Sequence, residues 1–378
     1  GFEVKKETLI IGAGPAGLAV SALLGKRNIP YTILEKQSSV GAAWRNHYER
    51  LHLHTVKEHS HLPMKPFPED YPRYVSRDLL VKYMEDYAEE FNIRPEFNEE
   101  VLSVSKTSSG WKAVSSKSVR NVDTLIVCAG YNHSPKTAEW PGMRTFKGRI
   151  IHSRDYRNGE EFKGQNVLVV GAGNTGGEIA IDLHEYGAKP TICVRGPLHI
   201  VPREIFGVPM QLMSLIMDRL PLGFADMMSR MILQAVTDDL SEYGIFKPNH
   251  GSVSQVVSQE KIPLVDIGTV KLIKSGDLKV TGDIDSFTED GIWYRNGKKE
   301  SYDAVILCTG YKPALNRIFN ENPELFNDRG YPVKKAEDCG NGLYFLGYTN
   351  HLTGFLRYIG VEAEKIAEEL AAKGSAYV

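Results

Sequence analysis

Residues Thr8 to Glu35, with the sequence TLIIGAGPAGLAVSALLGKRNIPYTILE, decide the fold of this chain. An apolar strand runs into a glycine turn, a helix follows over 18–25, and a second apolar strand over 31–34 ends at Glu35. The order of strand, glycine turn, helix, strand and acid is typical of a βαβ unit that binds a dinucleotide.

Each part of this unit has a physical task at the phosphates and the ribose of a dinucleotide. Gly12 permits the tight turn, Gly14 lets a pyrophosphate approach the backbone, and Gly17 lets the helix pack closely on the strand. Unpaired N–H groups and the helix dipole attract the phosphates, and the carboxylate of Glu35 accepts hydrogen bonds from ribose hydroxyl groups. The residues predicted to bind this dinucleotide are Gly12, Gly14, Pro15, Ala16, Gly17, Glu35 and Lys36.

The same pattern begins again at Asn166, with the sequence NVLVVGAGNTGGEIAIDLHEYGAKPTICVR. Its second strand ends at Arg195 instead of an acid, and a guanidinium binds a 2′-phosphate that a carboxylate would repel. We therefore predict FAD at the first unit and NADPH at the second, with Arg203 as an alternative to Arg195. The residues predicted to bind NADPH are Gly171, Gly173, Asn174, Thr175, Gly176, Arg195 and Arg203.

Two apolar strands that end in Gly-Tyr flank the second unit, at 128–131 and at 308–311. We interpret them as crossings between an outer domain and an inserted one. The predicted fold is α/β, with two Rossmann-like dinucleotide-binding domains and the NADPH domain inserted into the FAD domain. The predicted bounds are 1–163 and 310–378 for the FAD domain and 164–309 for the NADPH domain. Gly130, Gly310, Tyr311 and Gly347 are added to the cofactor site.

Composition indicates a soluble globular protein. Of the 378 residues, 42% are hydrophobic and 24% are charged, and the formal net charge of −2 gives no electrostatic reason to expect nucleic acid or an acidic membrane as a partner. The four cysteines are far apart and form no CxxC motif, which is typical of free thiols in a reducing compartment. With no signal peptide visible, we expect a cytoplasmic protein.

Residues 47–72 are rich in histidine and proline, and five of the eleven histidines lie between His47 and His61. Two interpretations compete, namely a metal cluster and a loop folded over a cofactor. The prolines exclude the helical spacing that metal ligands usually have, so we predict the cofactor loop and no metal site.

Residues 205–236 form an apolar segment that contains six of the nine methionines. Charged residues, among them Asp218 and Arg230, interrupt it too often for a transmembrane helix. Three interpretations stay open: a buried helical pair, the wall of an apolar substrate channel, and a surface that dips into a membrane.

Between the two units the stretch 146–156 reads FKGRIIHSRDY, which has the pattern FxGxxxHxxxY. This pattern resembles the signature of flavin-containing monooxygenases. Baeyer–Villiger monooxygenases typically end the motif in Trp, so Tyr156 argues against that group.

Over essentially its whole length the chain is similar to the plant YUCCA group. The similarity is carried by LHLH at 51–54 with Lys57, by FP and YP within 67–72, by LVDIGT at 264–269 and by IKSGDLKV at 273–280. His54 takes the place of an asparagine that many flavin-containing monooxygenases use beside the flavin, and histidine there is YUCCA-like. The chain departs from the group at Asn132, where we expect an acid, and at Gly177, where plant members tend to carry Met.

The resemblance implies an NADPH- and O2-dependent enzyme that acts through a C4a-(hydro)peroxyflavin and converts an aromatic 2-oxo acid, such as indole-3-pyruvate, to indole-3-acetate. N- or S-oxygenation of small soft nucleophiles and a flavin reductase or oxidase activity remain alternatives, whereas a disulfide reductase would need the missing CxxC. Membrane contact is not expected, and the oligomeric state is left open. The residues expected near the flavin are Trp44 and Arg45 as ligands, with His54, Thr55, Lys57 and Asn132 as catalytic candidates.

Overall fold

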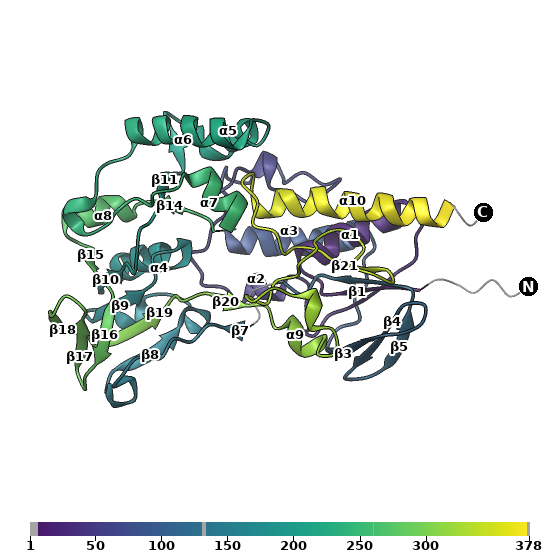
Figure 1. Ribbon diagram of the computed structural model, residues 1–378, viewed down its shortest axis with the longest axis horizontal. Helices are drawn as coiled ribbons and strands as arrows, with labels where there is room; N and C mark the ends of the chain where they lie inside the picture. The colour runs from purple at the N-terminus through teal and green to yellow at the C-terminus, as the bar shows by residue number, and fades with distance from the viewer. Residues whose placement is uncertain (1–6, 131–133, 260, 376–378) are drawn as a thin grey trace, which may run out of the picture.

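The computed structural model describes residues 7–130, 134–259 and 261–375. Two sheets lie side by side along the long axis of the molecule (Figure 1). Their strand orders are β2-β1-β6-β21 and β15-β10-β9-β19-β8, and every pair of neighbouring strands in them is parallel. The predicted α/β class with two Rossmann-like units is therefore confirmed.

The first sheet alternates its side chains between two cores, as a parallel strand buried on both faces must. Ile10 and Ile126 face a cluster with the helices, whereas Leu9 and Leu125 face a cluster with an antiparallel meander. The strands are β1 (Thr8–Ile11), β2 (Thr32–Leu34), β6 (Thr124–Val127) and β21 (Leu343–Phe345). The helices are α1 (Pro15–Lys26), α3 (Arg77–Glu90) and α10 (Phe355–Ser375), and the meander is β3 (Val101–Lys106), β4 (Trp111–Ser115) and β5 (Val119–Val122).

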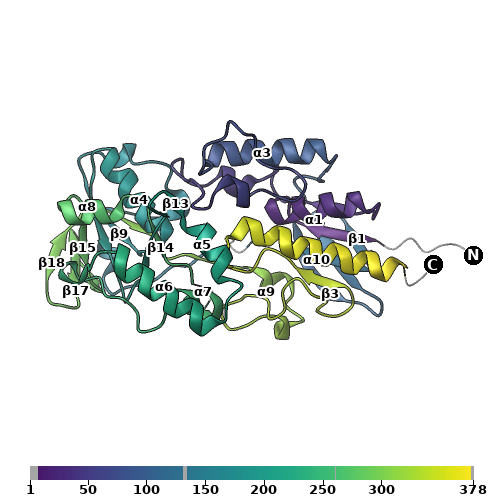
Figure 2. The ribbon, with the colours of Figure 1, turned by 90° about the horizontal axis from the view of Figure 1, so that it is seen from above.

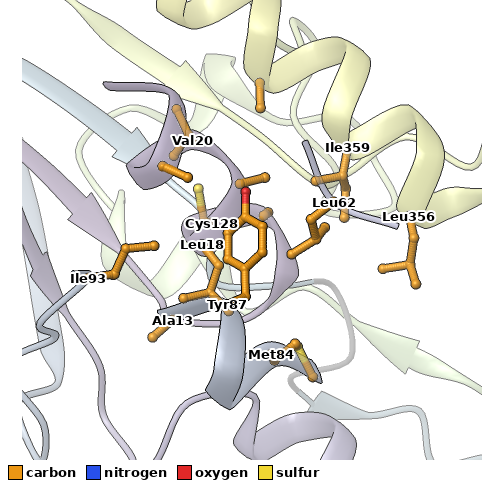
Figure 3. Close-up of a cluster of buried hydrophobic side chains, with 14 of the residues drawn as sticks. Ala13, Leu18, Val20, Leu62, Met84, Tyr87, Ile93, Cys128, Leu356 and Ile359 are labelled. Atoms are coloured by element: carbon orange, nitrogen blue, oxygen red, sulfur yellow. The ribbon is translucent and has the colours of Figure 1, made fainter. Parts of the chain in front are cut away.

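Helices α1, α3 and α10 enclose the larger core, in which Tyr87 lies among Leu18, Leu62 and Ile359 (Figure 3). The hydroxyl of Tyr87 donates to the carbonyl oxygen of Pro63 at 2.9 Å, so this buried polar group is paired. The bond also ties the histidine-rich loop to α3.

The second sheet repeats this arrangement. Val167 and Val169 pack toward α4 and α8, and Leu168 and Val170 pack toward the meander β16-β17-β18. The strands are β8 (Arg149–His152), β9 (Asn166–Val170), β10 (Lys189–Cys193), β15 (Lys279–Thr281) and β19 (Ala304–Leu307). The covering elements are α4 (Asn174–Glu185), α8 (Thr269–Ser275), β16 (Ile284–Phe287), β17 (Gly291–Tyr294) and β18 (Lys299–Ser301).

The chain passes between the two halves at a short antiparallel ribbon of β7 (Ser134–Pro135) and β20 (Tyr311–Lys312), visible near the centre of Figure 1. After β20 the chain returns to the first sheet, where β21 pairs with β6. Strand β8 precedes residue 164 but pairs with β19 of the second sheet. The domain bounds themselves remain a prediction.

The methionine-rich segment forms two helices outside the sheets, α5 (Met210–Met217) and α6 (Leu222–Val236), followed by α7 (Ser252–Gln259). Helix α5 lies beside the start of α10 (Figure 2), and its Gln211 donates to the carbonyl oxygen of Thr353 just before α10. Helices α5 and α6 are not a buried pair, because Ile216, Met227 and Met231 are 64%, 49% and 65% exposed. In the described part of the chain no helix has the length and apolar character needed to cross a bilayer.

Gln211 of α5 holds this segment to the FAD half. Its Oε1 accepts from Val56 N–H at 2.9 Å, and its Nε2 donates to the carbonyl oxygens of His59 (3.0 Å) and Thr353 (2.8 Å). The side chain is only 5% exposed, so these three bonds replace water that it has lost.

The contact between α1 and β1 can be tested at Gly17. A Cβ there would lie 1.8 Å from the carbonyl oxygen of Gly12, so we expect Gly17→Ala to lower the free energy of unfolding by about 2 kcal/mol or more. Gly25→Ala is the matched control, since Gly25 is exposed in the same helix with no atom within 4 Å of its Cβ position. The control should raise the free energy of unfolding by about 0.5 kcal/mol, because alanine is more stable than glycine inside a helix. Thermal unfolding of both variants measures the difference, and equal melting temperatures would contradict it.

The role of Gln211 can be tested with Gln211→Leu, which keeps the volume and removes all three hydrogen bonds. Because Val56 N–H and the Thr353 carbonyl group are then buried without partners, we expect a loss of about 3 kcal/mol in denaturant unfolding. Ile216→Ala on the same helix is the control, because shortening this exposed side chain should lower the free energy of unfolding by less than about 0.5 kcal/mol. A loss for Gln211→Leu no larger than that of the control would show that Gln211 does not anchor α5.

Candidate functional site

A cavity of about 610 Å³ opens where the first glycine turn, the histidine-rich loop and the methionine-rich helices meet. Its wall takes residues from both halves of the molecule, which is a common position for a ligand site. The predicted site residues that line it are Gly12, Gly14, Pro15, Ala16, Glu35, Lys36, Trp44, His54, Thr55, Gly130, Asn174, Arg203, Tyr311 and Gly347.

The first glycine turn has the shape that a pyrophosphate requires. Gly12 has φ +103°, and a Cβ there would lie 2.3 Å from the carbonyl oxygen of Cys128, so only glycine fits. The Cβ position of Gly14 has no atom within 4 Å, which leaves open space at the N-terminus of α1. The residues present therefore fit the phosphates of FAD.

Glu35 ends β2 beside this turn, as the sequence predicts, and its side chain is 8% exposed. Its Oε1 accepts from Ala13 N–H at 3.0 Å, and its Oε2 accepts from Gln37 N–H at 2.7 Å. The carboxylate thus braces the glycine turn, and each oxygen keeps a lone pair for a ligand in the cavity.

Two of the predicted residues near the flavin lie elsewhere, and a third cannot be placed. Arg45 is exposed and forms an ion pair with Glu85. Lys57 Nζ donates to the carbonyl oxygens of Glu69 (2.6 Å) and Tyr71 (2.7 Å) and so holds its own loop together, and neither Arg45 nor Lys57 lines the cavity. Asn132 lies outside the described residues.

The second glycine turn repeats the geometry of the first. Gly171 has φ +118°, a Cβ on Gly176 would lie 1.9 Å from the carbonyl oxygen of Gly171, and the Cβ position of Gly173 is open. This turn fits a second pyrophosphate at the N-terminus of α4. Gly171, Gly173, Thr175, Gly176 and Gly310 do not line the large cavity.

Asn174, at the start of α4, reaches the cavity but has protein partners. Its Oδ1 accepts from Val265 N–H at 2.8 Å, and its Nδ2 donates to the carbonyl oxygen of Pro263 at 3.3 Å. The side chain therefore joins the second glycine turn to β14 (Leu264–Asp266).

The two arginines considered for the 2′-phosphate have different surroundings. Arg195 is 48% exposed just beyond β10, with its Nε 3.8 Å from Asp283 Oδ1 and its guanidinium 5.6 Å from the ring of Trp140. Arg203 lines the cavity, and its guanidinium lies 4.0 Å from the ring of Tyr74. Only Arg203 is thus placed to meet a ligand inside the cavity.

His54 and His47 line the cavity as neutral imidazoles at pH 7. Burial, with the nearby arginines, lowers the pKa of each to about 4. His54 Nε2 lies 3.7 Å from Oε2 of Glu178, a buried residue of α4. Sequence analysis did not identify Glu178 or Gln211, although each is a polar residue beside apolar neighbours in a helix, which is a usable signal.

The FxGxxxHxxxY motif connects the two halves. His152 Nδ1 accepts from Arg154 N–H at 3.1 Å, so its proton lies on Nε2, which donates to the carbonyl oxygen of Gly310 at 3.2 Å. The Tyr156 hydroxyl donates to Asp182 Oδ2 at 2.5 Å. The first contact holds the crossing before β20 against the second sheet, and the second joins the segment after β8 to α4.

The four cysteines are free. Cys128 and Cys193 are buried, and burial raises the pKa of the Cys193 thiol to about 12, so this thiol is protonated and unreactive at neutral pH.

Comparison with known proteins separates enzyme classes that share this fold. A flavin monooxygenase from Stenotrophomonas maltophilia (TM-score 0.73, 20% identity, 97% of this chain and 99% of that one) and a bacillithiol disulfide reductase from Bacillus cereus (TM-score 0.70, 18% identity, 97% and 99%) are both similar in structure. At these identities the likeness shows the fold alone.

Sequence comparison supplies the class. The chain is 36% identical over 349 residues to the indole-3-pyruvate monooxygenase YUCCA1 of Oryza sativa subsp. japonica, which covers 90% of this chain and 86% of that protein. The sequence model of the flavin-binding monooxygenase-like family matches residues 5–324. The predicted enzyme class and the predicted cofactors FAD and NADPH are thereby confirmed. The chain belongs to the flavin-binding monooxygenase-like family and is an NADPH-dependent flavin monooxygenase.

Proposed function

We propose that this enzyme converts indole-3-pyruvate to indole-3-acetate. The observation that carries the proposal is the 36% identity, over nine-tenths of the chain, with a protein that has this activity in its name. The reaction balances when one 2-oxo acid, O2, NADPH and a proton give the shorter acid, CO2, water and NADP+. Decarboxylation removes the original carboxyl carbon, and one oxygen atom of O2 enters the new carboxyl group.

The two glycine turns would hold the two cofactors. FAD would lie on Gly12, Gly14 and the first turn of α1, with Glu35 at its ribose, and NADPH would lie on the turn at 171–176. Bound flavin supplies the oxygen chemistry, and the chain supplies binding, orientation and a dry cavity. Within this proposal the FAD-binding part comprises 1–163 and 310–378, apart from β8, and the NADPH-binding part comprises 164–309.

The methionine-rich helices support the substrate-channel interpretation. They place apolar side chains that suit an indole ring beside polar ones (Gln211, Ser214, Ser229 and Ser252) at the cavity, and methionine adapts its shape to irregular ligands. The apolar lining residues from α5, α7 and the loop after α7 are Met210, Met217, Val253, Val256 and Ile262. The carboxylate of a 2-oxo acid needs a cation, and Arg203 is present in the same cavity.

Product analysis tests the activity. Purified enzyme with NADPH, O2 and indole-3-pyruvate should give one indole-3-acetate and one CO2 for each NADPH oxidised, measured by mass spectrometry and absorbance. If thioethers or amines were oxygenated while the keto acid was left unchanged, the enzyme would be a heteroatom oxygenase. If hydrogen peroxide equalled NADPH consumption with every substrate tried, the proposal would fail altogether.

Substitution of Arg195 and of Arg203 should change different steady-state KM values. Arg195→Gln removes the proposed partner of the 2′-phosphate, so we expect KM for NADPH to rise about tenfold, or about 1.4 kcal/mol, with KM for NADH unchanged. Arg203→Gln should instead raise KM for indole-3-pyruvate by a similar factor. If Arg195→Gln raised KM for NADH as much as for NADPH, Arg195 would not contact the 2′-phosphate.

A further inference from the structure

Glu178 is a buried carboxyl group directly behind the cavity wall. It lies one turn after Asn174 in α4, and its side chain is 0% exposed. Neither of its carboxyl oxygens has a hydrogen-bond partner among the described residues, and neither does Nδ1 of His54. A buried polar group without partners normally signals a function, because it costs folding free energy.

The two basic side chains nearest to Glu178, Arg50 and His54, lie too far from it for a hydrogen bond. Arg50 Nη1 lies 3.7 Å from Oε1, but the guanidinium of Arg50 makes two hydrogen bonds to Glu185, at 3.2 and 3.1 Å. His54 Nε2 lies 3.7 Å from Oε2. The other titratable or charged groups that act on Glu178 and its neighbours are Asp182 on the same helix, Arg203 from the segment after β11 (Ile200–Pro202), and Tyr48 and His52 from the histidine-rich loop.

Burial sets the protonation state of both Glu178 and His54. A buried carboxylate is much less stable than the neutral acid, so burial raises the pKa of Glu178 to about 8, against the opposing effects of Arg50, the backbone N–H of His52 and Arg203. Burial likewise lowers the pKa of His54 to about 4. At pH 7 a neutral acid therefore faces a neutral imidazole.

We propose that Glu178 is a positioning residue that donates its carboxyl proton to Nε2 of His54 and so sets the tautomer and the orientation of this imidazole at the cavity wall. This hydrogen bond requires the present 3.7 Å separation to shorten, as polar contacts in a site do when it fills. The pair then contributes no charge to the wall. Ionisation of Glu178 would place a negative charge there, which would repel an anionic ligand in the cavity.

Infrared difference spectroscopy tests the protonation state without substrate, so its outcome is independent of the proposed reaction. Oxidised, FAD-loaded enzyme labelled with 13C-glutamate should show the C=O band of a buried protonated carboxyl group at pH 7, lost with a midpoint near pH 8. Glu178→Gln should lack the band. Glu289→Gln, the same change at an exposed glutamate that does not contact Arg50, should retain it. Absence of the band from the parent enzyme, or its persistence in Glu178→Gln, would overturn the proposal.

The pH dependence of stability gives a second readout. Between pH 5 and pH 8 folded Glu178 keeps a proton that the unfolded chain has released, so the parent loses stability as the pH rises. The melting temperature of Glu178→Gln minus that of the parent should therefore increase as the pH rises to 8 and stay constant above about pH 9. A difference independent of pH would contradict the proposal. If Glu178→Gln fails to fold, the presence or absence of the C=O band in the parent enzyme decides whether Glu178 is protonated at pH 7.

The role toward His54 is tested by kinetics and by nitrogen shifts. In the parent, KM for an anionic substrate should rise above pH 8 while kcat changes less, and Glu178→Gln should lose this rise. The 15N shifts of His54 should place its proton on Nδ1 at pH 7. A proton on Nε2, or an unchanged KM profile in Glu178→Gln, would show that Glu178 does not position this ring.

Discussion

The close approach of a helix to the strand before it is the contact on which the rest of this structure depends. A Cβ on Gly17 would lie 1.8 Å from the carbonyl oxygen of Gly12, and a Cβ on Gly176 would lie 1.9 Å from that of Gly171. Only glycine permits this packing, which brings the N–H groups of α1 and α4 to the carboxyl ends of their sheets. The same contact, made twice, sets both the fold and the two positions where phosphates can bind.

The space between these two turns is built by long-range polar contacts. Gln211 joins the methionine-rich helices to the FAD half, and His152 holds the crossing near Gly310. The partners of both side chains lie far away in sequence, so each contributes to keeping the halves in register. The cavity is a consequence of this arrangement, since its wall combines loops of the first half with helices of the second.

Charge is removed from part of the cavity wall by burial. His47 and His54 have lowered pKa values and Glu178 a raised one, so all three are neutral at pH 7. Arg203 remains as a charged group in the lining. The neutral side chains on this part of the wall suit an aromatic ligand, whereas Glu35, Lys36 and Arg154 line other parts of the same cavity.

The sequence by itself determined the two dinucleotide units, the helices and strands around them, and the enzyme class. The units and their elements are local, because glycine spacing, apolar periodicity and the acid or arginine after the second strand all lie within about 30 residues, whereas the enzyme class is carried by motifs spread along the whole chain. Only the tertiary structure decided which side chains face the cavity. In the folded chain Arg45 pairs with Glu85, and Lys57 bonds to its own loop. Glu178 lies beside His54, although the two residues are 124 positions apart in the sequence. The physical reason is that desolvation and hydrogen-bond pairing depend on neighbours brought together by folding, which no spacing within one segment reveals.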